Sequence, residues 1–337
     1  MTYRKIAELA GVSPSTVSKV FSGSTEISRE TADRVRQIAK EHGYTPARYY
    51  RGGKQNLHKI RVAVLVPEII SIYYSQIVTT SVRILREYGI QPNIYLTDFS
   101  EEETMSILYM LADEGLTDGI LTLQELKHVE KTLPLPVVQL FDNDNNRYID
   151  SVGYDFKHSF LEALSHLSAM GHRTFGFIGE QNTLRKLSHF LAAAESMSLS
   201  IDPSHIYISN KRFEKIGYEA AEHFLRLPAM PTAILTAYDE VALGAIQTFV
   251  KAGIRIPEDI SIIGINDIPF SSYAGIPLTT IQAFSEEAYR IAVRILLDKI
   301  QNTNNHAIQH VLIPCELVLR DTTAPAPMQN TPKENTP

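Results

Sequence analysis

The chain has little of what several classes of protein require. Cys315 is its single cysteine among 337 residues, so it can form neither an internal disulfide nor a thiolate metal cluster. No apolar run is long enough to cross a bilayer, and no charged segment followed by an apolar one opens the sequence. We therefore expect a cytosolic protein that does not contact a membrane.

The motifs of common catalytic and cofactor sites are also missing. The sequence contains no G-x-G-x-x-G, no phosphate-binding Gly-Lys loop, no H-E-x-x-H and no G-x-S-x-G, and no nucleophile has a base at a recognisable spacing. The run of Asp and Asn at 142–150 lacks the glycine and the closing glutamate of a calcium loop, which favours a polar turn. The sequence thus predicts no enzyme activity, no cofactor and no metal ion.

Charge is distributed unevenly along the chain. The formal net charge is −6, but residues 1–59 hold 11 Lys and Arg against 5 Asp and Glu, whereas the remainder holds 21 against 33. A basic head on an acidic body suits a head that neutralises nucleic-acid phosphates and a body that does not.

The basic head contains three short helical patterns within residues 3–44. Gly11 and Gly43 end the first and the third, while Ser13 and Ser28 precede the second and the third as N-caps. Pro14 fits the first position of the second helix, where its missing N–H costs nothing. Apolar residues at three-to-four spacing should face inward: Ile6, Leu9, Ala10, Val17, Val20, Phe21, Ala32, Val35, Ile38 and Ala39.

The second predicted helix leaves small polar residues on its outer face. Two helices joined by a tight glycine turn, the second of them polar outside, are typical of a helix-turn-helix unit. Its second helix is narrow enough to enter the major groove of DNA and to donate hydrogen bonds to base edges. An ordinary three-helix bundle with a solvated face is the alternative.

The runs AELAGVSPSTVSKVFSG and ISRETADRVRQIAKEHGYTPAR resemble, without a gap, the N-terminal domain of the LacI/GalR family of bacterial transcriptional regulators. The resemblance implies that the second helix reads base edges while neighbouring residues contact phosphates. The implied base-edge residues are Pro14, Ser15, Thr16 and Lys19, and the implied phosphate contacts are Thr2, Tyr3, Ser13, Ser18 and Ser28.

Residues 47–59 form a basic linker, which the resemblance identifies as a hinge that folds on the operator and enters the minor groove. Tyr50 and Arg51 are its candidate DNA contacts, with packing of Tyr50 against the head as the alternative. Gly53 stands where the family has an intercalating leucine, so we expect weaker kinking of the DNA.

From residue 60 onward, strand and helix patterns alternate, which predicts parallel sheets covered by helices on both faces. The predicted strands are 60–66, 93–98, 119–123, 136–141, 174–179, 205–209, 233–237, 260–266 and a final pair within 310–320. The predicted helices are 73–88, 102–114, 124–131, 156–170, 185–197, 212–225, 239–252 and 285–300. The cycle repeats in two similar halves, which predicts two doubly wound α/β lobes with a cleft between them.

This region resembles the type I periplasmic-binding-protein fold that the same family uses as a sensor. The resemblance implies a helix-turn-helix domain at 1–46, a hinge at 47–59, and an effector-binding and dimerisation domain at 60–321. Its first lobe would comprise about 60–156 and 284–314, and its second about 157–283 and 315–321. Residues 322–337 hold four prolines and no apolar period, which predicts a disordered tail.

Ligands of doubly wound sheets bind beyond the carboxyl ends of the strands, where we place the candidate effector contacts. Tyr73 and Tyr74 can offer a ring face to a sugar. Lys186 stands where the family has a ligand-holding arginine. Either Arg185 takes over that role, or the ligand differs, and the point charge of Lys186 then favours an anionic sugar acid or phosphate. Asp239 opens a helix, where capping is the alternative to ligand contact. The full set is Ser71, Tyr73, Tyr74, Asp155, Arg185, Lys186, Phe190, Tyr238, Asp239 and Asn266.

The sequence therefore predicts a homodimeric, sequence-specific transcription regulator, most simply a repressor. It would bind a palindromic operator in double-stranded DNA and respond to a small molecule, a sugar or sugar derivative. Two other classes share parts of the pattern. A solute-binding protein of a sugar transporter has such lobes but no use for a basic helical head. A Rossmann-type enzyme would need the phosphate loop that is missing here.

Overall fold

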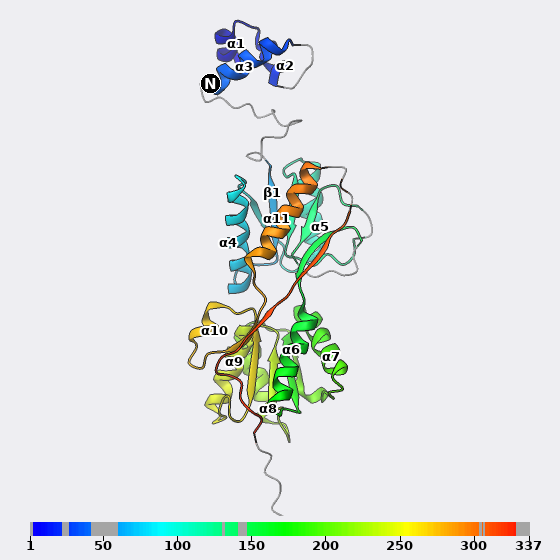
Figure 1. Ribbon diagram of the computed structural model, residues 1–337, viewed down its shortest axis with the longest axis vertical. Helices are drawn as coiled ribbons and strands as arrows, with labels where there is room; N and C mark the ends of the chain where they lie inside the picture. The colour runs from blue at the N-terminus through cyan, green and yellow to red at the C-terminus, as the bar shows by residue number, and fades with distance from the viewer. Residues whose placement is uncertain are drawn as a thin grey trace, which may run out of the picture. The chain divides into compact units, whose positions relative to one another are not determined.

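The computed structural model of the chain describes residues 3–21, 27–41, 60–129, 132–140, 147–302, 305 and 307–327 (Figure 1). The chain divides into two compact units, Met1–Ile60 and Arg61–Pro337. Among the described residues, no helix has the length and apolar character needed to span a membrane. Gly43 and the predicted hinge at 47–59 lie outside the described residues.

The first unit is built from α1 (Tyr3–Ala10), α2 (Pro14–Phe21) and α3 (Arg29–Glu41). Gly11 ends α1 with a φ of +63°, a conformation that favours glycine. The hydroxyl of Ser13 accepts the backbone N–H of Thr16 at 3.0 Å and caps α2, as predicted. Ser28 caps α3 in the same way, accepting the N–H of Thr31 at 3.3 Å.

The three helices share one apolar core, whose members are Ile6, Ala7, Ala10, Val17, Val20, Ala32, Val35 and Ala39. The prediction that Leu9 faces inward is wrong, because its side chain is 43% exposed. Ala7 takes the place of Leu9: α1 turns the face bearing Ile6, Ala7 and Ala10 toward α2 and α3.

The second unit contains two six-stranded sheets, each forming one lobe. The first sheet has the order β11-β5-β4-β3-β1-β2 and consists of parallel pairs. Its strands are β1 (Val62–Val66), β2 (Asn93–Leu96), β3 (Gly119–Thr122), β4 (Val137–Gln139), β5 (Asp150–Tyr154) and β11 (His310–Ile313). Its helices are α4 (Ile72–Glu87), α5 (Glu101–Asp113) and α11 (Glu286–Gln301). All five residues of β1 are buried, as expected of a parallel strand covered on both faces.

The second sheet has the order β12-β10-β9-β8-β6-β7, with only the edge pair β10–β12 antiparallel. Its strands are β6 (Phe175–Glu180), β7 (Ile206–Ser209), β8 (Ala233–Thr236), β9 (Ser261–Ile265), β10 (Thr279–Gln282) and β12 (Glu316–Val318). Its helices are α6 (Phe156–Ala169), α7 (Leu184–Ser196), α8 (Glu214–Leu225), α9 (Asp239–Lys251) and α10 (Pro269–Tyr273), with 3₁₀ turns at Gln181–Thr183 and Pro203–His205.

The chain passes between the two sheets after β5, after β10 and after β11. Figure 1 shows the last passage as the red segment that carries β11 on one lobe and β12 on the other. Two doubly wound lobes joined in this way, together with the helical head, confirm the predicted fold class. Ligands of doubly wound sheets bind beyond the carboxyl ends of the strands, and these ends of the two sheets meet where the chain passes between the lobes. The topology therefore places the candidate site between the lobes.

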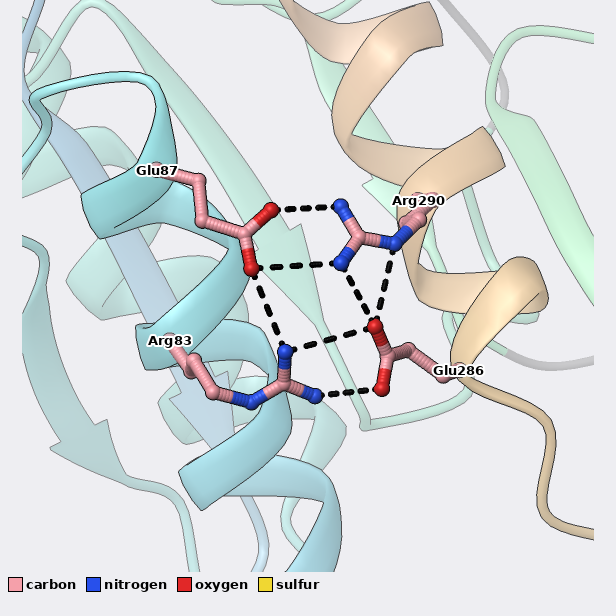
Figure 2. Close-up of polar contacts among 4 residues, drawn as sticks. All are labelled: Arg83, Glu87, Glu286 and Arg290. Atoms are coloured by element: carbon pink, nitrogen blue, oxygen red, sulfur yellow. Dashed lines mark hydrogen bonds and ion pairs between the residues drawn. The ribbon is translucent and has the colours of Figure 1, made fainter.

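A ring of four charged residues joins α4 to α11 on the surface of the first lobe (Figure 2). Arg83 donates to Glu286 at 2.5 Å and to Glu87 at 3.2 Å, and Arg290 donates to both carboxylates at 2.6 Å. Each guanidinium therefore contacts a carboxylate on each helix, so the two helices are linked at the point where α11 begins after a passage between the lobes.

Two predictions about this unit are wrong. Residues 124–129 form no helix; instead Leu126 is buried in the core, and its N–H donates to the side chain of Gln139 at 2.9 Å. Residues 322–327 are not disordered, because Thr322 exchanges backbone and side-chain hydrogen bonds with Ile262 in β9 and is fully buried. Residues 130–131 and 328–337 lie outside the described residues. The sequence pattern also missed β5, β10 and α10.

Candidate functional site

The polar face of α2 is the first candidate site. Ser15 and Lys19 are exposed and Thr16 is half-buried, while Val17 and Val20 on the opposite face are buried in the core of the head. This burial fixes which face of α2 points outward. The outer face therefore presents hydroxyl groups and one ammonium group, which suit base edges and phosphates.

The structure describes only some of the other residues that are predicted to contact DNA. Pro14, Ser13 and Ser28 are exposed at helix starts, and the hydroxyl of Ser13 also contacts that of Ser15 at 2.7 Å. Tyr3 lies in α1 and Ser18 in α2, with side chains outside the description. Thr2, Tyr50 and Arg51 lie outside the described residues altogether.

A pocket within the second unit, lined from both lobes, is the second candidate site. It encloses about 600 Å³ of empty space, part of it open to solvent. Six predicted residues line it: Ser71, Tyr73, Tyr74, Lys186, Tyr238 and Asn266. Eight further residues line it that the sequence did not point to: Phe99, Phe156, Glu180, Asn182, Thr183, Arg212, Phe213 and Glu240. The walls are thus strongly aromatic, with a few convergent polar groups, as is usual for small-molecule sites.

The three tyrosines of the pocket, Tyr73, Tyr74 and Tyr238, lie at the starts of helices. Ser71 caps α4 by accepting the N–H of Tyr74 at 3.1 Å, and the rings of Tyr73 and Tyr74 meet edge to face at 5.5 Å. The hydroxyl of Tyr238 accepts the N–H of Phe213 at 2.9 Å. Burial raises the pKa of all three tyrosines above their usual value of 10.0, so their hydroxyls stay protonated.

Arg212 lines the pocket and contacts residues of both lobes. Its guanidinium lies 4.5 Å from the ring centres of Phe99, in the first lobe, and Phe213, in the second. It pairs with Glu180 at 3.4 Å and more distantly with Glu68 of the first lobe at 3.5 Å, a separation that makes an ion pair but not a hydrogen bond. The protein itself thus surrounds this cation with two carboxylates and two rings.

Lys186 is the other cation of the pocket. Its ammonium group donates to the carbonyl of Ala237 at 2.7 Å and lies 5.0 Å from the ring centre of Phe156. Burial lowers the pKa of Lys186 from 10.5 to about 8, because the charged form is removed from water. The lysine is therefore held by a backbone carbonyl rather than by a carboxylate.

Four predicted effector contacts do not line this pocket. Asp155 caps α6 by accepting the N–H of His158 at 3.0 Å, and Phe190 is fully buried among aromatic rings. Arg185 donates to Glu125 of the first lobe at 2.9 Å. Asp239 is fully buried and accepts hydrogen bonds from α10 and β10, so it ties these elements to α9. None of them has a side-chain atom on the pocket lining.

Some of the missed residues carried a signal in the sequence. Glu180 ends β6 and Phe99 follows β2, so the rule that ligands lie beyond strand ends includes both. Arg212 follows β7 by three residues, and only its contacts with Phe99 and Glu68 reveal that it reaches across the lobes.

A helix-turn-helix head and a two-lobed domain with a lined pocket define the class of DNA-binding transcription regulators that carry a sensor domain. Residues 2–47 match the model of the lacI family of bacterial regulatory proteins, and residues 164–323 match a periplasmic binding protein-like domain. The HTH-type transcriptional repressor PurR of Haemophilus influenzae strain PittEE is 31% identical over 334 residues, which cover 95% of this chain and 97% of the relative.

Two solved structures share the fold of the chain. One is the lac repressor dimer bound to operator and an anti-inducer, with a TM-score of 0.75 and 23% identity over 96% of this chain and 99% of that one. The other is a complex of the transcriptional regulator CelR with cellobiose, with a TM-score of 0.67 and 24% identity over the same shares of each chain. The chain belongs to the LacI family, and it is a DNA-binding transcription regulator rather than an enzyme.

Proposed function

We propose that this protein is a homodimeric repressor that binds a palindromic operator through α2 and releases or strengthens that binding when a sugar or sugar derivative occupies the interlobe pocket. It acts in the cytoplasm, where its DNA target lies. The observation that carries the proposal is the outward polar face of α2, held in place by the burial of Val17 and Val20. The relative PurR is named a transcriptional repressor, which supports the direction of regulation.

The residues of the head take distinct parts in this proposal. Pro14, Ser15, Thr16 and Lys19 contact base edges, and Thr2, Tyr3, Ser13, Ser18 and Ser28 contact phosphates. Residues 47–59 form the hinge, whose Tyr50 and Arg51 contact the DNA. Two heads of one dimer read two inverted half-sites, because a two-fold dimer presents the same surface twice.

The lining of the pocket supports a sugar effector. Ring faces such as Tyr74 and Phe99 suit the C–H faces of a sugar, while the convergent polar groups suit its hydroxyls. The solved CelR structure holds cellobiose, which supports the same class of ligand here. Since both lobes line the pocket, a ligand that fits one lobe arrangement better than another shifts the protein toward that arrangement.

DNA binding is tested by selecting duplexes from a random library with the full-length protein and measuring affinity by fluorescence anisotropy. We expect an inverted repeat to be enriched, and its affinity to fall steeply between 50 and 200 mM salt. Enrichment of no palindromic duplex would contradict the proposal. Adding ribose, glucose, cellobiose or adenosine to the complex with the selected operator then asks whether any of them changes the affinity.

A further inference from the structure

Two residues that line the pocket each carry a buried oxygen acceptor without a donor among the described residues. Oε2 of Glu240 and Oδ1 of Asn266 both belong to lining residues, and neither accepts a hydrogen bond from any described residue. Asn266 is 4% exposed, and its backbone φ of +107° lies in a region that residues other than glycine rarely adopt. A buried acceptor left without a donor is unfavourable, so a ligand bringing O–H or N–H groups would be stabilised here.

The cations of the pocket are already engaged by the protein. Arg212 lies between Glu68 and Glu180 and between two aromatic rings, and Lys186 donates to the carbonyl of Ala237. An acidic ligand would have to draw one of them away from these partners. The pocket thus offers free acceptors to a ligand, while each of its two cations already has partners within the protein.

The charge balance points in the same direction. Glu68, Glu180 and Glu240 supply three carboxylates around the pocket, whereas Arg212 and Lys186 supply two cations. Arg212 is paired with Glu68 and Glu180, which leaves Glu240 without a hydrogen-bonded cation. A carboxylate or phosphate on the ligand would lie among these groups in a partly dehydrated site, where repulsion between like charges is strong.

We propose that Glu240 selects the effector by charge: with Asn266 it accepts hydrogen bonds from an uncharged, hydroxyl-bearing ring, and it rejects acidic ligands. This inference rests on the proposed function, and it reverses the expectation that Lys186 favours an anionic effector. Burial raises the pKa of Glu240. A hydroxyl donor would lower this pKa again by hydrogen-bonding to the charged carboxylate, whereas a second negative charge would raise it further.

The test compares uncharged ligands with their acidic counterparts. The probes are ribose with ribose 5-phosphate, glucose with glucuronate, cellobiose with cellobionate, and adenosine with AMP, each titrated into full-length protein by calorimetry. For the uncharged probe that binds most tightly, we expect its acidic counterpart to bind at least tenfold more weakly. In Glu240→Gln that ratio should shrink at least tenfold, since the amide accepts a weaker hydrogen bond and carries no charge.

A matched variant separates this effect from a general loss of carboxylates. Glu222→Gln changes an exposed residue of α8 that pairs only with Arg226 among the contacts described, so its ratio should equal that of the wild type. Equal or tighter binding of an acidic probe by the wild type, an unchanged ratio in Glu240→Gln, or binding of no uncharged probe would overturn the inference. Operator binding in the same preparations distinguishes these results from a failure of the proposed function, because it does not depend on Glu240.

Discussion

Arg185, at the start of α7 in the second lobe, donates to the carboxylate of Glu125 in the first lobe at 2.9 Å. The bond joins the two lobes, and the ion pair of Arg212 with Glu68 joins them at a second point. The chain thus has its own polar contacts between the lobes. Any ligand that moves the lobes must act against these contacts or together with them.

Removal of the first contact is expected to loosen the lobes locally. Arg185→Ala should raise amide exchange several-fold at residues 124–129 and at the start of α7, because the bond is partly exposed and contributes on the order of 1 kcal/mol. Strand β8 in the same lobe should be unchanged. Arg226→Ala, which breaks a pair with Glu222 at the C-terminal end of α8, serves as the control in hydrogen-exchange mass spectrometry. Unchanged exchange at 124–129 would show that this bond does not hold the lobes together.

The outer face of α2 makes a prediction about base reading. Lys19→Ala should weaken binding to the selected operator by about 1–3 kcal/mol and relax preference at one base position. Lys5→Ala, on α1, changes the same charge away from that face and should lower the affinity for all duplexes alike. Anisotropy titrations with the operator and with a scrambled duplex separate the two effects. An equal loss on both duplexes in Lys19→Ala would make Lys19 a phosphate contact only.

The packing of α8 on α9 depends on two glycines. A Cβ built at Gly217 would lie 2.1 Å from the carbonyl oxygen of Val241, and one at Gly244 would lie 2.2 Å from that of Glu214. Gly244→Ala should therefore force the helices apart and lower the free energy of unfolding by about 3 kcal/mol. Gly275→Ala is the control, because no atom lies within 4 Å of its added Cβ. Urea denaturation measures both, and equal midpoints would refute close backbone packing as the cause.

Asp239 gives the second lobe a dependence on pH. Burial raises the pKa of Asp239 from 3.8 to about 7, although three hydrogen bonds oppose the shift. The folded state holds this proton more tightly than the unfolded state, so ionisation of Asp239 lowers the free energy of unfolding. This loss is absent below pH 3.8, grows as pH rises, and is complete above about 7. The wild type should thus lose stability relative to Asp239→Asn over this range, by up to about 4 kcal/mol.

A second aspartate supplies a control of opposite sign. Hydrogen bonds from Ser204 lower the pKa of Asp202, so its contribution to stability is present above 3.8 and is lost as pH falls. The wild type should therefore gain stability relative to Asp202→Asn as pH rises. Urea midpoints measured across a pH series give both trends. Parallel curves for the wild type and Asp239→Asn would show that Asp239 titrates normally.

The charged ring of Figure 2 makes a prediction about salt and acid. Hydrogen bonds from Arg83 and Arg290 lower the pKa of Glu286, so its stabilising effect is complete above 4.5 and fades as pH falls through the lower folded-state value. Glu286→Gln should lower the thermal midpoint at pH 7 and low salt, and the difference should shrink in 1 M NaCl or acid. Glu287→Gln, beside it on α11 with one ion pair to Arg294, should have a smaller effect.

The structural features that the sequence predicted correctly are those whose signal is local in the chain. Caps at Ser13 and Ser28 and the stop at Gly11 were correctly predicted because they involve residues within one turn. Periodicity misplaced Leu9 and the supposed helix at 124–131, since the period alone does not say which neighbour covers a face. Prolines suggested disorder at 322–327, but backbone pairing with Ile262 orders this segment.

The sequence by itself determined the head, the alternation of strand and helix, and the region of the pocket, because each is encoded in caps, periods and strand ends that neighbouring residues share. Only the tertiary structure decided which side chains meet there. Arg212 contacts Glu68 and Phe99, and Asp239 accepts a hydrogen bond from Thr280, although these partners are far apart in the chain. Burial then determines the charge balance of the pocket. Desolvation and ion pairing depend on neighbours in three dimensions, which cannot be deduced from a local sequence pattern.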